Sequence, residues 1–209
     1  MLSCSIIIQG LATEAAFSPT FDPTTQPPTP SSSPEAIALD AFYDEANGIN
    51  WNIDTNWKTS PDVCVWYGVE CDNDWKVVGL FLKNNNMYGS ISSSIGLLTD
   101  LVEIDFDSNY LTGTIPSKIG NLENLRIFEV DDNRLSGPVP SSLASIKNLK
   151  EVYLQKNNFN GTMPQELCHR RDHSGGELDT LIADCSGDGN SFGNEDIVCP
   201  LHECCSICQ

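Results

Sequence analysis

The sequence has few basic residues and no long apolar run. It carries 11 lysines and arginines against 29 aspartates and glutamates, a formal net charge of −18. A chain this acidic repels nucleic-acid phosphates and anionic lipid, so both are poor partners. No stretch reaches the roughly 20 apolar residues that a membrane-spanning helix needs, and we predict no direct membrane span. The acidity favours a basic or cationic partner, or serves solubility alone.

Motifs for common catalytic chemistry are also lacking. The chain has no glycine-rich phosphate loop and no HExxH zinc motif. Carboxylates occur in pairs, but a shallow open surface would neither desolvate them nor separate their pKa values as a glycosidase requires. We therefore predict that the chain is not an enzyme and that it uses no cofactor.

Cysteine, by contrast, is abundant, and nine cysteines predict an oxidising compartment. Cys64 and Cys71 bracket a segment short enough to close as a local disulfide, and we predict that they pair. Six more lie near the C-terminus: Cys168, Cys185, Cys199, Cys204, Cys205 and Cys208. Disulfides of unknown pairing are favoured for these six, and zinc bound by the last four is the alternative.

Three segments precede the repetitive part of the chain. Residues 1–17 contain a short apolar run without a basic start, which predicts a weak signal peptide or leader, or the stub of a longer protein. Residues 18–33 are rich in proline, serine and threonine and predict an extended stalk. Residues 34–76 are predicted to form a cap, with a helix that begins after Ser33 and a cluster of tryptophans that fills its core.

A repeat of constant length follows. Asn85, Asn109, Asn133 and Asn157 are 24 residues apart, and so are Gly89, Gly113, Gly137 and Gly161. Four blocks occupy residues 77–172, and residues 173–209 hold a partial fifth block and a cysteine-rich cap. In each block apolar residues alternate as a short strand, which can bury its face only against the next coil. The asparagines are predicted to bond the backbone of neighbouring coils as a ladder.

The pattern LxxLxLxxNxLxGxIPxxIGxLxxL, preceded by a helix and by CVWYGVEC, resembles the plant-type extracellular leucine-rich-repeat family. Receptor-kinase ectodomains and polygalacturonase inhibitors belong to this family. The tail LIADC and its cysteines are similar to acidic leucine-rich-repeat proteins of algae such as diatoms. The resemblance implies an α/β fold, a right-handed solenoid with a parallel β-sheet on its concave face, a helical disulfide-linked cap before it and a cysteine-rich cap after it.

The strand positions that should face solvent are acidic. Stacked strands lie about 4.8 Å apart, so Asp105 should lie beside Glu129, and Asp107 beside Asp131. Like charges opposite one another are destabilising, which predicts a basic protein or peptide ligand, or a divalent cation, unless the face is simply solvated. The predicted ligand-binding residues are Glu103, Asp105, Asp107, Glu129, Asp131, Asp132, Glu151, Phe81 and Tyr153.

These features predict a recognition module, secreted or tethered at the cell surface, that binds a ligand or co-receptor through its concave face. Two alternatives stay open: an inhibitor of a secreted hydrolase such as polygalacturonase, and a cell-wall or matrix adhesion protein anchored by its stalk. The sequon at Asn160 is a candidate N-glycosylation site, or simply a turn.

Overall fold

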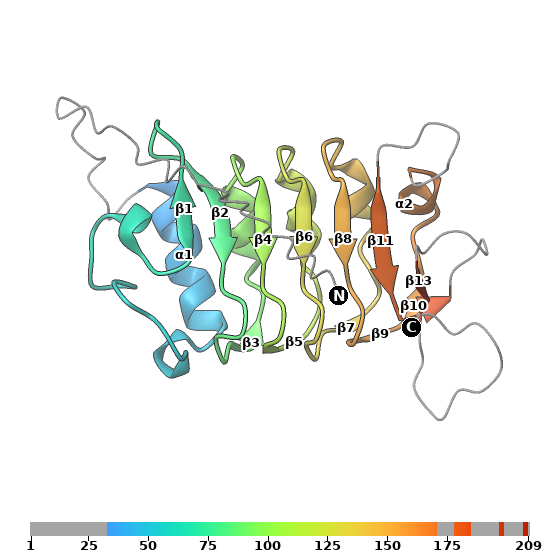
Figure 1. Cartoon of the computed structure of the whole chain (residues 1–209), viewed down its shortest axis with the longest axis horizontal. Coiled ribbons are helices and arrows are strands. Elements are labelled where there is room, and N and C mark those ends of the chain that lie inside the picture. The colour runs from blue at the N-terminus through green and yellow to red at the C-terminus, as the bar shows by residue number, and fades with distance from the viewer. Residues whose placement is uncertain (1–32, 171–177, 185–196, 199–206, 209) are drawn as a thin grey trace, which may run out of the picture.

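The computed structural model describes residues 33–170, 178–184, 197–198 and 207–208, the last two pairs by their backbone alone. Successive coils stack side by side along one long axis (Figure 1). One sheet runs through the stack, and its neighbouring strands are parallel except for the first pair. In spatial order its strands are β1 (Val69–Cys71), β2 (Val77–Phe81), β4 (Glu103–Asp105), β6 (Ile127–Glu129), β8 (Glu151–Tyr153), β11 (Thr180–Ala183) and β13 (Ile207–Cys208). The predicted α/β solenoid is confirmed.

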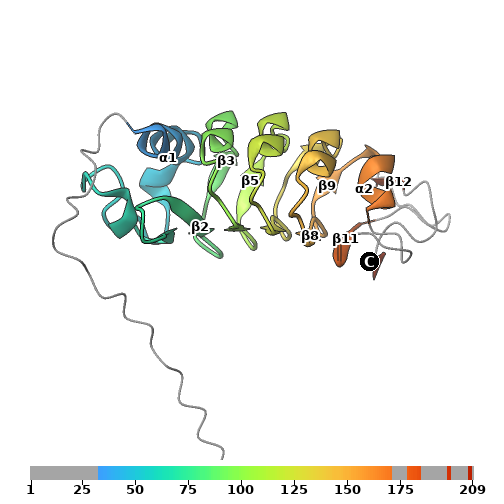
Figure 2. The ribbon, with the colours of Figure 1, turned by 90° about the horizontal axis from the view of Figure 1, so that it is seen from above.

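The opposite side of each coil carries a helical turn. These turns are η3 (Ser93–Leu97), η4 (Ser117–Asn121), η5 (Ser141–Ser145) and α2 (Gln165–His169). Figure 2 shows them along one long edge of the molecule, with β2, β8 and β11 along the other. Short parallel pairs run between these two edges: β3 (Tyr88–Ser90) with β5 (Tyr110–Thr112), β7 (Ser136–Gly137) with β9 (Asn158–Phe159), and β10 (Gly161–Thr162) with β12 (Ile197–Val198). We call the solvent-facing side of β2, β4, β6, β8 and β11 the sheet face.

Apolar side chains from every coil fill the space between the two edges. In the second block Leu101, Ile104 and Phe106 are fully buried, and the equivalent residues of the next blocks are buried in the same way. Each such side chain contributes about 1.5–3 kcal/mol by leaving water. Because the inner face of one coil is covered only by its neighbours, the coils are stable as a stack and not singly.

The repeated asparagines join the coils. Asn109 accepts hydrogen bonds from the backbone N–H of Asn85 (2.9 Å) and Met87 (3.0 Å), and its Nδ2 donates to backbone carbonyls that include that of Leu82 (2.9 Å). The ladder continues beyond the repeats at both ends. Ile53 of the cap donates its N–H to Asn85 Oδ1 (2.8 Å), and in the fifth coil Asp184 Oδ2 accepts from the N–H of Asn157 (3.0 Å).

Aromatic packing and one disulfide build the N-terminal cap. Helix α1 (Pro34–Glu45) is capped by Ser33, whose hydroxyl oxygen accepts from the N–H of Ala36 at 3.1 Å. The rings of Trp57 and Trp66 lie 4.8 Å apart, and both side chains are buried. Two short turns, η1 (Gly48–Asn50) and η2 (Val63–Val65), connect this core to the sheet. The predicted disulfide between Cys64 and Cys71 is confirmed.

Several predictions fall outside the described residues. They are the leader at 1–17, the stalk before Ser33, and the side chains of Cys185, Cys199, Cys204, Cys205 and Cys208. Cys168 at the end of the fourth block is disulfide-bonded. Among the described residues, no helix is long and apolar enough to cross a membrane.

Candidate ligand-binding face

Parallel pairing places residues from successive repeats in straight columns on the sheet face. In the central column Asp105 of β4 lies directly beside Glu129 of β6, as the 24-residue period predicts. Phe81 flanks this pair on the β2 side, and Tyr153 flanks it on the β8 side. Across these four strands the column therefore consists of two acidic residues with an aromatic residue on each side.

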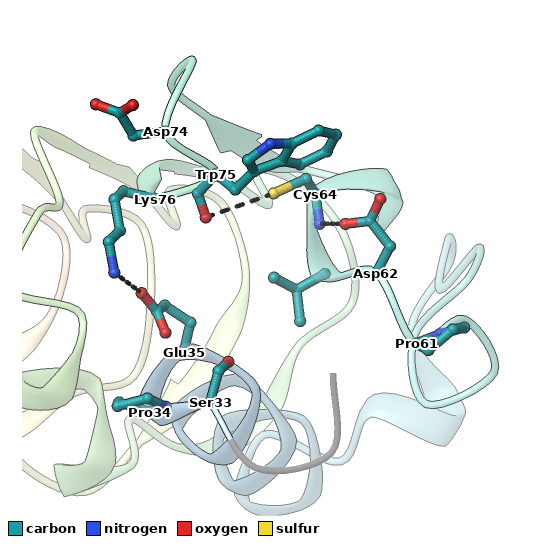
Figure 3. A pocket seen from close by; sticks show the side chains of 10 residues that line it. Ser33, Pro34, Glu35, Pro61, Asp62, Cys64, Asp74, Trp75 and Lys76 are labelled. Atoms are coloured by element: carbon teal, nitrogen blue, oxygen red, sulfur yellow. Dashed lines mark hydrogen bonds and ion pairs between the residues drawn. The ribbon is translucent and has the colours of Figure 1, made fainter. Parts of the chain in front are cut away.

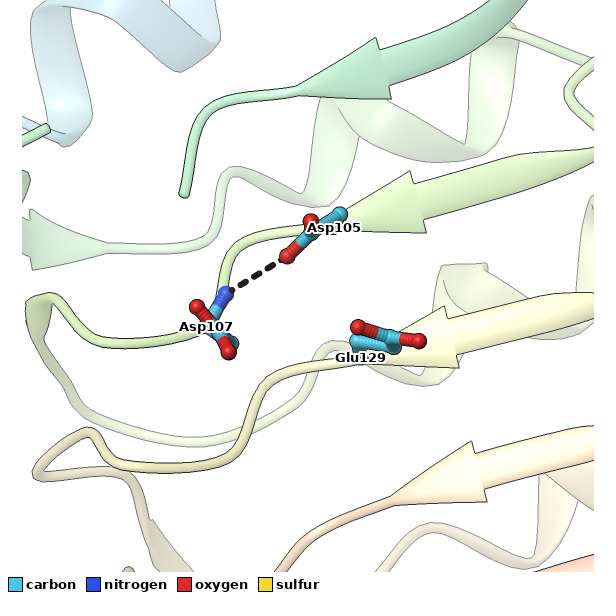
Figure 4. A group of neighbouring side chains, drawn as sticks. All are labelled: Asp105, Asp107 and Glu129. Atoms are coloured by element: carbon cyan, nitrogen blue, oxygen red, sulfur yellow. Dashed lines mark hydrogen bonds between the residues drawn. The ribbon is translucent and has the colours of Figure 1, made fainter. Parts of the chain in front are cut away.

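Four carboxylates gather where the central strands end. Asp105, Asp107, Glu129 and Asp131 form what we call the acidic cluster. The first three each place a carboxylate oxygen within 4.8 Å of the others (Figure 4). The backbone N–H of Asp107 donates to Asp105 Oδ1 at 3.2 Å, and Gln155 Nε2 donates to Asp131 Oδ2 at 3.0 Å. These bonds hold the side chains on the face before any ligand arrives.

The structure corrects the prediction for Asp107, which is buried and not solvent-facing, with 8% of its surface exposed. Lys83, one repeat earlier in the same column, covers it on one side and places Nζ 2.6 Å from Asp107 Oδ2. Sequence reasoning missed this ion pair, although the separation of 24 residues between the two positions is the signal that reveals it.

The other predicted residues lie around the cluster. Glu103 and Glu151 stand in a neighbouring column, separated by Ile127. The hydroxyl of Tyr153 donates to Glu151 Oε2 at 2.7 Å. Asp132 is apart from them, in an exposed turn with a positive φ of 51°, where its carboxylate accepts from the Ser108 hydroxyl at 3.3 Å.

The pKa of Glu129 is strongly raised. Burial, and then the charges of Asp105, Asp131 and Asp107, raise the pKa of this carboxyl to about 7, against a weaker opposing effect of Lys83. Burial likewise raises the pKa values of Asp105 and Asp131 above their ordinary range. The face thus holds four neighbouring carboxylates against one lysine, and a positive charge from outside would stabilise it.

Two buried acceptors of this face have no hydrogen-bond donor within the described part of the chain. They are Asp107 Oδ1 and Gln155 Oε1, which lie on either side of Asp131 in the same column. Leaving a buried acceptor without a partner costs about 1–3 kcal/mol. The sheet face therefore has more hydrogen-bond acceptors than donors among the described residues.

A pocket of about 360 Å³ lies in the N-terminal cap beside the disulfide (Figure 3). Its lining includes Glu35, Asp62, Trp75 and Lys76. Lys76 Nζ lies 3.1 Å from Glu35 Oε1, so those two charges compensate each other. Its lining residues include no nucleophile paired with a base, and we assign no chemistry to the pocket.

Comparison with known proteins identifies the repeat. The leucine-rich-repeat family model matches residues 100–122 and 148–169, the second and fourth repeats. The chain therefore contains leucine-rich repeats. Its relatives include the LRR receptor-like serine/threonine-protein kinase ERECTA of Arabidopsis thaliana, which is 46% identical over 61 residues, 28% of this chain and 6% of that protein. A probable inactive leucine-rich repeat receptor-like protein kinase of the same plant is 34% identical over 80 residues, 38% of this chain and 12% of that protein.

Solved plant ectodomains share the fold. The BIR3–SERK2 complex of Arabidopsis thaliana contains a chain with a TM-score of 0.61 and 23% identity, covering 81% of this chain and 98% of that one. The LRR ectodomain of GASSHO1/SCHENGEN3 from the same plant, solved in complex with CASPARIAN STRIP INTEGRITY FACTOR 2, has a TM-score of 0.50 and 30% identity, covering 58% of this chain and 14% of that one. The predicted resemblance to plant receptor ectodomains is confirmed. The chain spans only 6% and 12% of the length of the two curated relatives, so no activity of theirs is assigned to it.

Proposed function

We propose that this protein is an extracellular recognition module whose sheet face binds a protein or peptide rich in basic side chains. The observation that carries the proposal is the acidic cluster, whose half-buried carboxylates repel one another and are compensated by Lys83 alone among the described side chains. A ligand that brings lysine or arginine to this cluster would relieve repulsion already present in the free protein.

The geometry suits such a ligand in two further ways. Charge-assisted hydrogen bonds are worth about 1.5–3 kcal/mol each, and the partly buried carboxylates of Asp105 and Glu129 are screened less by solvent than freely exposed ones. Phe81 and Tyr153 flank the acids and can cover the aliphatic part of a basic side chain. The same surplus of carboxylate oxygens also suits a divalent cation.

Related structures and the chain's own chemistry support this role. The GASSHO1/SCHENGEN3 ectodomain was solved with a bound partner, which supports binding as a use of this scaffold. The cap disulfide suits an oxidising compartment outside the cell. Asn160 lies half-buried between β9 and β10, and we propose it as an N-glycan site on the flank of the solenoid, away from the sheet face.

A peptide-capture experiment tests the proposal. The full chain, produced with its disulfides and kept in EDTA, is exposed to a library of peptides with random sequences, and the retained peptides are sequenced. We expect enrichment of lysine and arginine, and affinities that fall as NaCl rises from about 50 to 500 mM. The double variant Asp105→Asn/Glu129→Gln should lose at least about tenfold in affinity, which corresponds to about 1.4 kcal/mol.

The matched control is Glu123→Gln/Glu166→Gln, which removes the same number of charges at exposed positions outside the sheet face. It should bind as the wild type does. Retained peptides without basic enrichment, or equal capture by the Asp105/Glu129 variant and the wild type, would show that the acidic cluster is not the binding site.

A further inference from the structure

We infer that the flank of the solenoid formed by β3, β5, β7 and β9 binds an uncharged polysaccharide. This surface, which we call the tyrosine flank, runs along the lower edge of Figure 1, between the sheet face and the helical turns. The inference does not rest on the proposed function, because it concerns a different surface and a ligand without charge.

The tyrosine flank has very few charges, although the chain as a whole has a formal net charge of −18. Its strands and the segments after them occupy residues 86–92, 110–116, 134–140 and 158–164. Arg134 is the one charged residue in these ranges. Glu45 of α1 reaches the first coil, where its carboxylate accepts hydrogen bonds from the hydroxyls of Ser92 (2.7 Å) and Ser90 (3.4 Å). Because covering a charged group with a neutral ligand costs desolvation energy, an uncharged ligand suits a surface that lacks such groups.

Two exposed tyrosines lie side by side on the tyrosine flank. Tyr88 of β3 pairs with Tyr110 of β5 in parallel register, and the two residues are 54% and 45% exposed. Arg134 of the next coil places its guanidinium carbon 4.9 Å from the centre of the Tyr110 ring, which holds that ring in position before a ligand binds. Adjacent exposed aromatic residues mark a binding surface. The C–H groups on the face of a pyranose sugar pack against such rings without needing any charge.

Hydroxyl and amide groups surround the two rings. Thr112 donates its hydroxyl to the backbone carbonyl of Gly89 at 2.9 Å, and Ser136 donates to that of Gly113 at 3.3 Å. Each of these hydroxyl oxygens keeps a lone pair for an outside donor, and the exposed amide of Asn158 offers both donors and an acceptor. A polysaccharide carries hydroxyls that donate and accept, so these neutral groups are complementary to it.

The repeat favours a polymer over a single sugar. Backbone N–H groups bond from coil to coil along the tyrosine flank, from Tyr110 to the carbonyl of Met87 (2.9 Å) and from Arg134 to that of Leu111 (2.8 Å). Stacked strands lie about 4.8 Å apart, so similar contacts recur along the axis, and successive units of one extended chain can use successive coils. The N-glycan proposed at Asn160 would lie in the fourth repeat, whereas the two exposed tyrosines belong to the first and second.

Co-sedimentation of the full chain, produced with its disulfides, tests the inference with amorphous cellulose and with an insoluble β-1,3-glucan as probes. We expect saturable binding to at least one of them, with an affinity that changes less than about twofold between about 50 and 500 mM NaCl, because no charge pair forms. Carboxymethyl cellulose, which has the cellulose backbone and added acidic groups, should bind less at low salt because the protein is acidic.

Substitutions of the two tyrosines locate the site. Tyr88→Ala/Tyr110→Ala should lower the affinity at least about tenfold, because both ring contacts are lost. Tyr88→Phe/Tyr110→Phe keeps the rings and should stay within about threefold of the wild type. The matched control is Tyr67→Ala, which removes an exposed tyrosine of the N-terminal cap and should bind as the wild type does. Far-ultraviolet circular dichroism of each variant checks that it is folded.

Two outcomes would overturn the inference outright: no saturable binding to either polysaccharide, or equal affinities for the wild type and the Tyr88/Tyr110 alanine variant. Dimerisation that the alanine variant loses, without polysaccharide binding, would also overturn it and would assign the tyrosine flank to a second copy of this chain. Asp105→Asn/Glu129→Gln should leave polysaccharide binding unchanged, so this site and the peptide site of the sheet face can fail independently.

Discussion

Glu129→Gln should stabilise the folded protein at alkaline pH. The pKa of Glu129 rises from 4.5 to about 7 on folding, chiefly through burial and then through the neighbouring acids. That difference of about 2.5 pH units corresponds to about 3.4 kcal/mol at 1.36 kcal/mol per unit. Because the side chain is only half-buried, solvent and salt screen part of the repulsion, and we expect about 1–2 kcal/mol.

The sign follows from the protonation states. Above pH 7 the glutamate is charged in both the folded and the unfolded chain, and the charged form is disfavoured only in the folded one. Lowering the pH from 8 through 7 toward 4.5 lets the folded state take up the proton first, so the wild type gains stability over this window. The advantage of the neutral glutamine should therefore be full at pH 8 and absent below pH 4.5.

Thermal unfolding in EDTA at low ionic strength measures this effect. At pH 8 the variant should unfold about 2–8 °C higher than the wild type, and the difference should vanish near pH 4. Glu123→Gln, whose side chain is exposed and outside the sheet face, serves as the control and should change little at either pH. A variant that is no more stable than the wild type at pH 8, or equally stabilised at both pH values, would refute the electrostatic argument.

Three further changes test the scaffold. Asn109→Ala should lower the free energy of unfolding in urea by at least about 3 kcal/mol, because the buried N–H groups of Asn85 and Met87 lose their acceptor. Asn148→Ala removes one exposed hydrogen bond and should cost under about 1 kcal/mol. Equal costs for the two variants would contradict the role of the ladder. Phe128→Ala should cost about 3–5 kcal/mol by leaving a cavity in the core, and a cost below about 1 kcal/mol would mean that the coils repack. Replacing Cys64 and Cys71 together by serine should lower the free energy of unfolding by about 2 kcal/mol, because the cap loses its disulfide. An unchanged free energy of unfolding would show that this disulfide does not stabilise the cap.

Much of the candidate site could be predicted from the period of the repeat. Positions 24 residues apart must lie side by side in a regular stack, which places Asp105 beside Glu129 before any coordinates are known. The same rule also relates Lys83 to Asp107, and applying it to charges of both signs would have found that ion pair. The columns of the face are thus a property of the sequence.

The ends of the solenoid were less predictable. In the fifth coil an aspartate, Asp184, takes the place of the ladder asparagine although it stands two positions earlier in the block. At the other end Ile53, far from any repeat, bonds Asn85. These contacts at the ends join segments that do not share the 24-residue period, so the spacing of the repeat does not predict them.

The repeat pattern alone was enough to predict the solenoid, the asparagine ladder and the acidity of one face, because a constant period forces equivalent residues to stack. The folded structure was needed to show that Asp107 is buried with one oxygen that no described residue bonds, and that burial and the neighbouring acids raise the pKa of Glu129 to about 7. Burial depends on which side chains of the adjacent coils cover an atom, and charge coupling depends on distances across strands. Neither quantity can be read along a single chain.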